Sequence, residues 1–368
     1  MLKYKSSISV TQYKKIFTIN LTKDIVNFII TLTLLSDKVY TGEFTMENNT
    51  LVAFRRDIKI LDATIRDGGI VNNFEFTDEF VRKLYLANVK AGVDYMEFGY
   101  KADPDMFSVD EYGKWKFSKD EDIRAIVGDN NTDLKISVMA DAGRTNFKRD
   151  ILPRSESPID MIRVATYIYQ LPLAIEMIED AHANGYETCV NIMAISKVQE
   201  DDLMKGLELL GKTNVDVIYL VDSFGVLFPE QALRLTQLYK EIANKYGKKI
   251  GVHTHNNQQL AFANTIESMR AGASYLDGTV SGMGRGAGNC HMESLLAMLR
   301  NPKYRIAPIL DFIAEEMPKI KESGAVWGFD IPYMLTGALN IHPSSAIKFI
   351  KDGRDDYSEF YKELLEDN

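Results

Sequence analysis

The sequence predicts an α/β protein, a TIM (β/α)₈ barrel followed by a C-terminal helical extension. From Ile58 onward, eight short runs rich in β-branched residues alternate with amphipathic stretches of helical period. Stretches of that length between strands are typical of parallel crossover connections. The chain has 368 residues, which accommodates one barrel of about 250 residues with helices appended to it.

The strand assignment depends on apolar runs that are bounded by turn residues and helical stretches. Eight parallel strands favour a closed barrel, although a doubly wound open sheet has the same periodicity. The predicted strands are Ile58–Thr64, Asp94–Gly99, Leu134–Ala140, Asp160–Ala165, Glu187–Met193, Asp216–Val221, Lys249–His253 and Tyr275–Val280.

Helical periodicity fills most of the intervals between these strands and continues beyond the last one. We therefore divide the chain into an N-terminal extension (1–57), a catalytic barrel (58–300) and a C-terminal helical extension (301–368) that ends in an acidic tail. The predicted helices are Asp78–Ala91, Leu171–Asn184, Glu200–Gly211, Pro229–Tyr246 and Gln258–Ala271 in the barrel, then His291–Arg300, Ile309–Lys321, Pro332–Ala338 and Ser344–Lys351.

The first 45 residues differ in composition from the rest. Their apolar run Ile25–Leu35 is too short to span a bilayer, which requires about 20 apolar residues. A signal peptide would be followed by a small-residue cleavage site, but the polar residues Ser36, Asp37 and Lys38 follow instead. We expect the natural start at Met46 and a cytoplasmic protein.

Composition excludes some classes of partner. The formal net charge is −9 and there is no cluster of lysine and arginine, which argues against nucleic-acid binding. The two cysteines, Cys189 and Cys290, lack metal-site spacing and suit a reducing compartment. A membrane partner is not expected, and a homo-oligomer stays open.

Polar residues follow the predicted strands, at the end of a barrel where active sites lie. His253 and His255 are two residues apart in a strand, so their side chains point to one face and can bind one ion. Together with a carboxylate they suit Mn²⁺ or Mg²⁺, with Zn²⁺ as an alternative. The structural alternative is that the two histidines fill the barrel mouth or cap a helix.

Two further segments lie where such a site would form. Arg66 and Asp67 follow the first strand, where the carboxylate can bind the metal and the guanidinium can stabilise an oxyanion, unless the pair only brackets the turn at Gly68. The glycine-rich segment 282–289 follows the last strand. It either wraps an anion with its N–H groups or brings Asn289 to the metal.

These motifs, in this order, resemble the DRE-TIM metallolyase superfamily, with its HMG-CoA lyase-like or pyruvate carboxyltransferase-type barrel. The resemblance covers about Ile58 to Arg300 and is greatest to the 4-hydroxy-2-oxovalerate aldolase branch. Its most specific stretches are Leu61–Gly68, Ile162–Thr166, Val221–Ser223, Gly251–Asn257 and Gly282–Asn289.

The resemblance implies roles for individual residues. Asp67, His253 and His255 would bind the metal, with Asn289 as a fourth ligand. Arg66 would stabilise the enolate of a 2-oxo acid, and Ser223 would contact the substrate. Thr166, at the end of the fourth strand, is a further predicted substrate-binding residue. The implied function is a class II aldolase that cleaves or forms a carbon–carbon bond of a 4-hydroxy-2-oxo acid, yielding pyruvate and an aldehyde.

The sequence departs from both branches of the superfamily at the groups that transfer protons. The aldolases carry a catalytic histidine where this chain has Ile70, and the acyl-CoA-using synthases carry a Glu-Gln pair where it has Gly69 and Ile70. The C-terminal tyrosine of the aldolases has no counterpart in the segment 337–343, but His342 lies there. We predict that His342 is the general base; a helix-capping role and metal-bound hydroxide are the alternatives.

Two other functions stay open on the sequence alone. One is an acyl-CoA synthase or lyase of the Claisen type, which the missing Glu-Gln pair disfavours. The other is a catalytically silent homologue that acts as a binding protein. The silent homologue is opposed by five retained site residues, Arg66, Asp67, His253, His255 and Asn289, because buried charges without a metal would cost stability.

Overall fold

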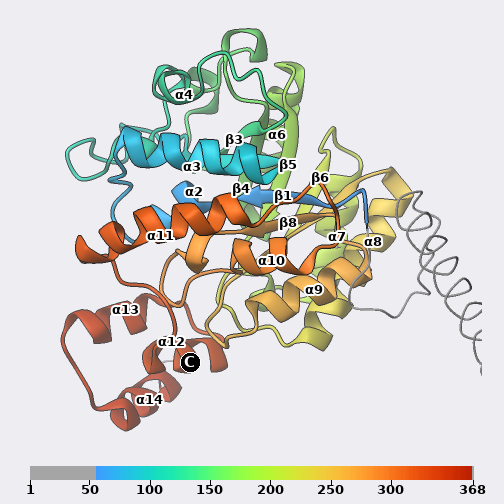
Figure 1. Cartoon of the computed structure of the whole chain (residues 1–368). Coiled ribbons are helices and arrows are strands. Elements are labelled where there is room, and N and C mark those ends of the chain that lie inside the picture. The colour runs from blue at the N-terminus through green and yellow to red at the C-terminus, as the bar shows by residue number, and fades with distance from the viewer. Residues whose placement is uncertain (1–54, 367–368) are drawn as a thin grey trace, which may run out of the picture. The chain divides into compact units, whose positions relative to one another are not determined.

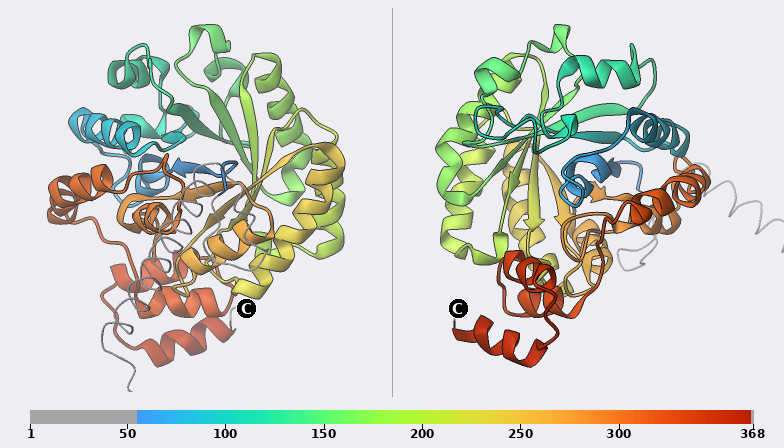
Figure 2. Two further views of the ribbon diagram at one scale, coloured as in Figure 1. Left: turned by 45° about the vertical axis from the view of Figure 1, so that its right-hand side comes forward. Right: turned by 90° about the vertical axis from the view of Figure 1, so that its left-hand side faces the viewer.

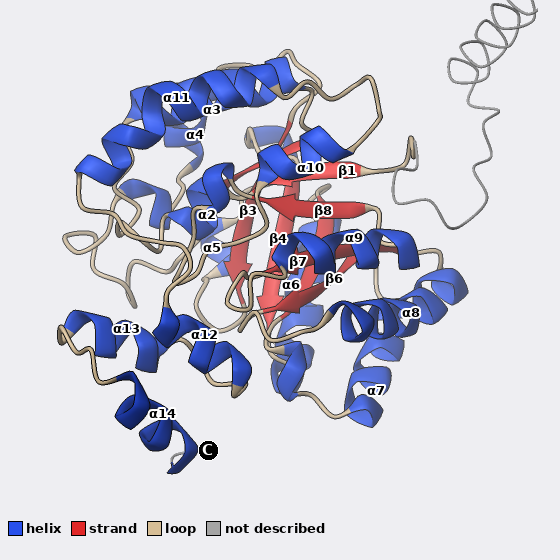
Figure 3. Ribbon diagram, turned by 60° about the horizontal axis from the view of Figure 1, so that its bottom comes forward, coloured by secondary structure: helices blue, strands red, loops and turns tan. Residues whose placement is uncertain are grey.

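The computed structural model describes residues 55–366, and these form a closed barrel of eight parallel strands (Figures 1 and 3). The strands pair in chain order, and β1 pairs with β8 to close the barrel. The predicted fold class is therefore confirmed. The strands are β1 (Lys59–Asp62), β2 (Tyr95–Tyr100), β3 (Lys135–Asp141), β4 (Met161–Thr166), β5 (Glu187–Ile192), β6 (Val217–Asp222), β7 (Lys249–Thr254) and β8 (Tyr275–Gly278).

Helices surround the barrel (Figure 3). In α3 both ends are capped: the Thr77 side chain accepts a hydrogen bond from Phe80 N at the first turn, and Gly92 ends the helix with a φ of 74°. The barrel helices are α2 (Thr64–Gly68), α3 (Asp78–Ala91), α4 (Asp120–Val127), α5 (Phe147–Asp150), α6 (Leu171–Ala183), α7 (Glu200–Gly211), α8 (Pro229–Tyr246) and α9 (Ala261–Ala271).

Alternation along the strands divides the core into two layers. The larger layer lies between strands and helices, and a smaller cluster fills the barrel interior. Within β4, Met161 belongs to the interior cluster and Ile162 and Val164 to the outer layer. Odd-numbered residues of β4 therefore face the barrel axis.

Five helices follow the barrel strands. Among these, α11 lies against α3, where the rings of Phe80 and Phe312 meet edge to face at 5.2 Å (Figure 1). The last three helices gather together (Figure 2) around the small core of Ala346, Phe349, Phe360 and Leu364. The helices are α10 (Met292–Met298), α11 (Ala307–Glu322), α12 (Ile331–Ala338), α13 (Ser344–Lys351) and α14 (Tyr357–Glu366).

The α12 helix packs onto the loop that follows β7. Asn257 Nδ2 donates to Tyr333 O at 3.1 Å, and Gln258 Nε2 donates to Met334 O at 2.8 Å. These bonds place the C-terminal helices at the carboxyl ends of the strands, where a barrel carries its active site.

The structure differs from the sequence prediction at the end of β1. We expected the strand to continue to Thr64, but it ends at Asp62, and Arg66 and Asp67 lie in the short helix α2. The side chain of Asp62 accepts the Thr64 N–H at 2.9 Å, and Asn88 donates to its other oxygen at 2.6 Å. This local hydrogen bond turns the chain out of the strand.

Helices α4 and α14 were not predicted. Both are short, at 8 and 10 residues, so each offers few turns over which a helical period can be recognised in the sequence. The expected start at Met46 and the apolar run Ile25–Leu35 lie outside the described residues. Within residues 55–366 no helix is long and apolar enough to span a membrane.

Candidate metal centre

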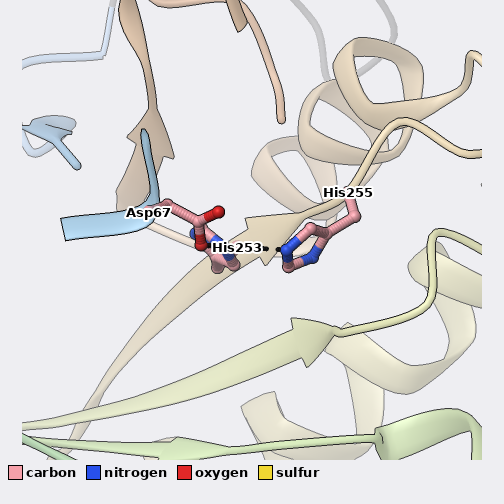
Figure 4. A group of neighbouring side chains, drawn as sticks. All are labelled: Asp67, His253 and His255. Carbon is pink, nitrogen blue, oxygen red and sulfur yellow. Dashed lines mark ion pairs between the residues drawn. The ribbon is translucent and has the colours of Figure 1, made fainter. Parts of the chain in front are cut away.

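Asp67, His253 and His255 converge at the carboxyl ends of β1 and β7 (Figure 4). Their candidate ligand atoms all lie within 4.8 Å of one another, and all three residues are buried. Asp67 Oδ2 is 3.3 Å from His253 Nε2 and 3.7 Å from His255 Nε2. The three predicted ligands therefore form one cluster.

Second partners fix the orientation of both imidazole rings. His253 Nδ1 lies 3.1 Å from Asp277 Oδ2, and His255 Nδ1 lies 3.0 Å from the carbonyl oxygen of Asp222. Because each partner is an acceptor, each Nδ1 carries the proton and donates it. Each Nε2 is left with a lone pair that faces Asp67, as in metal sites whose histidines are held by a carboxylate or a carbonyl.

Asn289 lies beside the cluster. It forms an antiparallel β-bridge with His255, and its Oδ1 is buried. Gly284 makes this approach possible, because a Cβ there would lie 2.0 Å from Asn289 Nδ2 and 2.8 Å from Asp67 Oδ1. The glycine-rich segment therefore brings Asn289 to the cluster, which was one of the two roles left open for it.

Unpartnered atoms indicate what the cluster binds. Asp67 Oδ1, His253 Nε2 and Asn289 Oδ1 are buried and have no hydrogen-bond partner among the residues described. Burying such atoms without a partner is costly. Two neutral imidazoles, one carboxylate and one amide oxygen suit a divalent cation such as Mn²⁺, Mg²⁺ or Zn²⁺. The residues therefore fit the metal that the sequence implied.

Arg66 stands beside the cluster. Its Nε donates to Glu97 Oε2 at 2.9 Å, and its Nη1 donates to the second carboxylate oxygen of Asp67, Oδ2. No described residue accepts a hydrogen bond from its third nitrogen, Nη2. Arg66 also lines the cavity described below. The guanidinium is therefore held in place at two nitrogens and retains a third for a ligand.

Buried ion pairs continue from Glu97 to the metal cluster. Arg163 Nη1 donates to Glu97 Oε2 at 2.8 Å, and its Nη2 donates to Asp277 Oδ2 at 2.6 Å. Arg163 and both carboxylates are fully buried, and the Arg163 guanidinium also lies 4.4 Å from the centre of the Tyr219 ring. Asp277 in turn accepts a hydrogen bond from His253. Ion pairs and hydrogen bonds therefore connect Arg66 to His253 through Glu97, Arg163 and Asp277.

The protonation states follow from these contacts. Burial opposes ionisation of Asp67, but the charge of Arg66 and the two histidines hold its pKa well below the usual range. Burial lowers the pKa of His255 to about 3, so this ring is neutral near neutral pH. Burial also disfavours a charged His253, but the carboxylates of Asp277 and Asp67 beside its two ring nitrogens outweigh that effect and raise its pKa. A cation would have to displace that proton.

A cavity of about 90 Å³ opens directly above the cluster. Arg66, Asp67, His253 and His255 form one side of it, and Ser223 and Ile70 also line it. Ser223 Oγ accepts the Ala194 N–H at 2.8 Å. The predicted substrate contact Ser223 and the isoleucine at the family's histidine position therefore lie in the same cavity as the cluster. The remaining lining residues include Tyr100, Met139, Asp141, Ala165, Asn191, Met193 and Arg285.

Three predicted site residues do not line this cavity: Asn289, which lies beside the metal cluster, Thr166 and His342. Thr166 is fully buried, shares the outward face of Ile162 and Val164, and donates to Tyr167 O at 3.0 Å. His342 is exposed; Ser344 N donates to its Nδ1 at 3.1 Å, and its Nε2 lies 3.4 Å from Nη1 of Arg285, which does line the cavity. Burial, followed by the charge of Arg285, lowers the pKa of His342 to about 4.

A larger cavity, of about 710 Å³, lies at the opposite, amino-terminal end of the strands. Its lysines are largely engaged: Lys59 and Lys303 pair with Asp94, and Lys135 pairs with Glu187. That end of a barrel contributes to stability. The chemistry therefore belongs to the smaller cavity.

Residues 57–316 match the HMGL-like family model. The chain belongs to the HMGL-like family. Among curated relatives, a 4-hydroxy-2-oxovalerate aldolase from Brevibacillus brevis is 32% identical over 244 residues, which are 66% of this chain and 70% of the relative. An oxaloacetate decarboxylase from Mycobacterium tuberculosis is 29% identical over 285 residues, 76% of this chain and 82% of the relative. The chain is thus a member of a lyase family.

Solved structures agree with this assignment. A Bacteroides vulgatus structure, described as the N-terminal domain of an aldolase, is 30% identical with a TM-score of 0.70, covering 80% of this chain and 96% of that one. An HMG-CoA lyase from Bacillus subtilis has a TM-score of 0.59 at 15% identity, covering 73% of this chain and 96% of that one, and shows the shared fold.

The sequence analysis missed Asp277 and the cavity residues Tyr100, Asp141 and Asn191. A signal for three of them was present: Asp141, Asn191 and Asp277 are polar residues within or next to predicted strands, at positions that share the parity of interior residues. Polar residues on the interior face of a barrel strand are costly unless they are paired or functional. Asking, for each strand, which polar residues fall at interior-facing positions would have identified these three residues.

Proposed function

We propose that this protein is a divalent-metal-dependent aldolase that cleaves, or forms, the bond between C3 and C4 of a 4-hydroxy-2-oxo acid. The products of cleavage are pyruvate and an aldehyde. The observation that carries the proposal is the cluster of Asp67, His253 and His255 beside Arg66, on one side of a single cavity. The cation is Mn²⁺ or Mg²⁺, with Zn²⁺ as the alternative.

The residues of the site have separate roles in this proposal. Asp67, His253, His255 and Asn289 would hold the cation, and a cation bound there would supply Lewis-acid polarisation of the keto oxygen of the 2-oxo acid. Arg66, fixed by Glu97 and Asp67, directs its third nitrogen to the oxygen that becomes negative. In cleavage, a base removes the proton of the 4-hydroxyl group and the electrons of the C3–C4 bond form the enolate. C3 then takes up a proton to give pyruvate.

The base in this proposal is His342. Its pKa of about 4 leaves the ring neutral near neutral pH, so it can accept a proton. Its Nε2 contacts Arg285, which lines the cavity next to Ser223. His342 itself does not line the cavity, so a proton from the substrate would have to reach it past Arg285. Ser223, on the cavity wall, is the proposed contact of the substrate, whereas Thr166 lies on the outward face of β4 and is not part of this proposal.

A second candidate is favoured by one observation. Ile70, at the position of the aldolases' histidine, lines the cavity. Decarboxylation of a 2-oxo acid with a carboxylate on C3 passes through the same enolate but requires no base, because CO₂ leaves without a hydroxyl proton. The relative from Mycobacterium tuberculosis is named for this kind of reaction, the decarboxylation of oxaloacetate.

The deciding experiment measures pyruvate release by the Mn²⁺-loaded protein from a panel of 4-hydroxy-2-oxo acids and, in parallel, from oxaloacetate. Acetyl-CoA consumption with 2-oxo acids tests the Claisen alternative. Protein stripped with a chelator is the control, and reloading should restore activity. Pyruvate from oxaloacetate alone would replace the aldolase by a decarboxylase. No turnover in any arm, together with no bound metal, would leave a binding protein.

A further inference from the structure

Two polar side chains stand on the cavity wall that faces the metal cluster across the barrel. Asp141 ends β3 and Asn191 lies in β5, whereas the cluster is built from β1, β7 and the loop after β8. The register pairs Asp141 with Ala165 of β4, and Ala165 with Asn191. The three residues thus form one row across neighbouring strands, and all three line the cavity.

At the centre of this row stands the small side chain of Ala165, and we call the space above it, between Asp141 and Asn191, the recess. Neighbouring strands lie about 4.8 Å apart, so Asp141 and Asn191 stand roughly 10 Å apart with only the methyl group of Ala165 between them. Arg163, one layer deeper on the same face of β4, donates from Nη1 to Glu97 and from Nη2 to Asp277. The recess is therefore flanked by two polar side chains and closed below by a buried ion pair.

Neither polar side chain has a partner within the described part of the chain. Asp141 Oδ1 and Asn191 Oδ1 are buried and accept no hydrogen bond there, and Asn191 is only 2% exposed. Other buried carboxylates at the same end of the barrel, such as Asp222, accept backbone N–H groups. Unpaired buried acceptors are costly, so their donors enter the cavity with what binds there.

The charges around Asp141 and Asn191 indicate which kind of donor group binds to them. Burial raises the pKa of the Asp141 carboxyl group; the positive charges of Lys116, Arg144 and Arg66 oppose that effect, and they disfavour an ammonium group in the recess. Arg285 lines the same cavity with a buried Nε that has no partner among residues 55–366. A neutral hydroxyl group fits this mixture, because it donates to a carboxylate or amide oxygen and accepts from a guanidinium.

We propose that the aldehyde partner of the reaction is a small hydroxyaldehyde, whose hydroxyl groups donate to Asp141 and Asn191. This inference rests on the proposed function. With the 2-oxo acid end held at Arg66, the rest of a 4-hydroxy-2-oxo acid extends across the cavity to the β3–β5 wall. An aldehyde with a plain alkyl chain would leave both acceptors unpaired. A site built to bind a hydroxyl group rejects the analogue that lacks it.

The test is a comparison of aldehydes in the condensation with pyruvate, using the Mn²⁺-loaded full chain. We expect kcat/KM for glyceraldehyde to exceed that for butanal, an alkyl aldehyde of similar size, by about 100-fold or more. Asn191→Leu keeps the side-chain volume but removes the acceptor, so the ratio should fall by about 10-fold or more. Asp141→Asn replaces a charged acceptor by an amide and should lower the same ratio.

Cys189→Ala is the matched control. Cys189 lies on the same face of β5, one layer deeper, and belongs to the interior cluster rather than to the cavity lining. The Cys189→Ala substitution changes the packing of β5 without changing the cavity lining. The ratio of kcat/KM for glyceraldehyde to kcat/KM for butanal should therefore stay as in the parent protein. If Asp141→Asn abolished turnover of both aldehydes equally, Asp141 would be a proton-transfer group and the inference would be wrong.

Exchange of the pyruvate methyl protons for deuterium, followed by NMR, separates this inference from the proposed function, because enolate formation needs no aldehyde. Exchange without a preference for glyceraldehyde would overturn the hydroxyaldehyde and leave the aldolase standing. No exchange and no turnover would overturn both. Exchange, preference for glyceraldehyde and loss of that preference in Asn191→Leu would support both.

Discussion

Nδ1 of His253 lies 3.1 Å from Oδ2 of Asp277, and this contact joins β7 to β8 behind the metal cluster. The carboxylate also accepts from Arg163, so it is fixed from two sides. It directs the other ring nitrogen of His253 towards Asp67. The predictions below begin with this pair.

We expect His253→Ala and His255→Ala to lose the bound metal, because each removes one of three clustered ligands. Asp277→Asn should retain the ligands but weaken metal affinity by about 10-fold to 100-fold, because the ring loses its fixed orientation. Metal content and calorimetric titration measure both effects. Asp160→Asn, which removes a carboxylate from the opposite end of the barrel, is the control. Unchanged metal content in both histidine variants would refute the ligand assignment.

Arg66→Lys should bind metal normally and lose most of its turnover. A lysine ammonium cannot reach Glu97 and Asp67 together and still present a third donor to the substrate. Steady-state kinetics beside metal analysis of the same preparation checks this expectation. Near-normal kcat would mean that Arg66 has only a structural role.

Metal affinity should fall as the pH falls. His253 has a raised pKa, above its ordinary value of 6.5, and only its neutral form binds a cation. Below that pKa each pH unit should weaken binding by about tenfold. Above it the affinity should level off. His255, with a pKa of about 3, stays neutral throughout and adds nothing to this dependence. Titrations between about pH 6 and pH 8 measure it, and a flat profile would contradict the assigned role of His253.

A chain that begins at Met46 should fold and keep its metal. β1 begins at Lys59, and both of its neighbours, β2 and β8, lie within the described residues. Solubility, thermal melting and metal content compare it with the full chain. An insoluble product would show that the leading segment is required for folding.

His342→Gln should lower kcat by about 10²–10⁴-fold with metal content intact, if the imidazole is the base. Ser344→Ala is the matched control, because it removes the hydroxyl group that lies 2.9 Å from Nδ1 and leaves the ring. A change of only a few-fold would reject this role and turn attention to Tyr100, whose side chain lines the cavity.

Much of the candidate site could be predicted from the sequence because its signals are local. His253 and His255 share a strand face at a separation of two residues, and Arg66 and Asp67 are adjacent. Each motif therefore carries its geometry within a few residues. Ile70 was also identified, and the structure places it on the cavity wall.

Other relationships could not be predicted in this way, because they depend on pairs of residues far apart in the chain. Arg163 meets Asp277, although 114 residues separate them, because barrel closure brings β4 and β8 to face each other across the interior. Thr166 was predicted in the site from its position at a strand end, but the face it occupies depends on strand parity, which points it away from the cavity.

The sequence by itself determined the eight alternating strand and helix segments and the local motifs of the metal-type cluster, because hydrophobic periodicity and short motifs record local geometry directly. That the eight strands close into a barrel rather than an open sheet was decided by the tertiary structure. Only the tertiary structure decided that Asp277 orients His253, that Asp141 and Asn191 flank a recess above Ala165, and that His342 lies against Arg285. Those contacts depend on the register between strands and on how the barrel closes, and no local pattern of residues encodes either one.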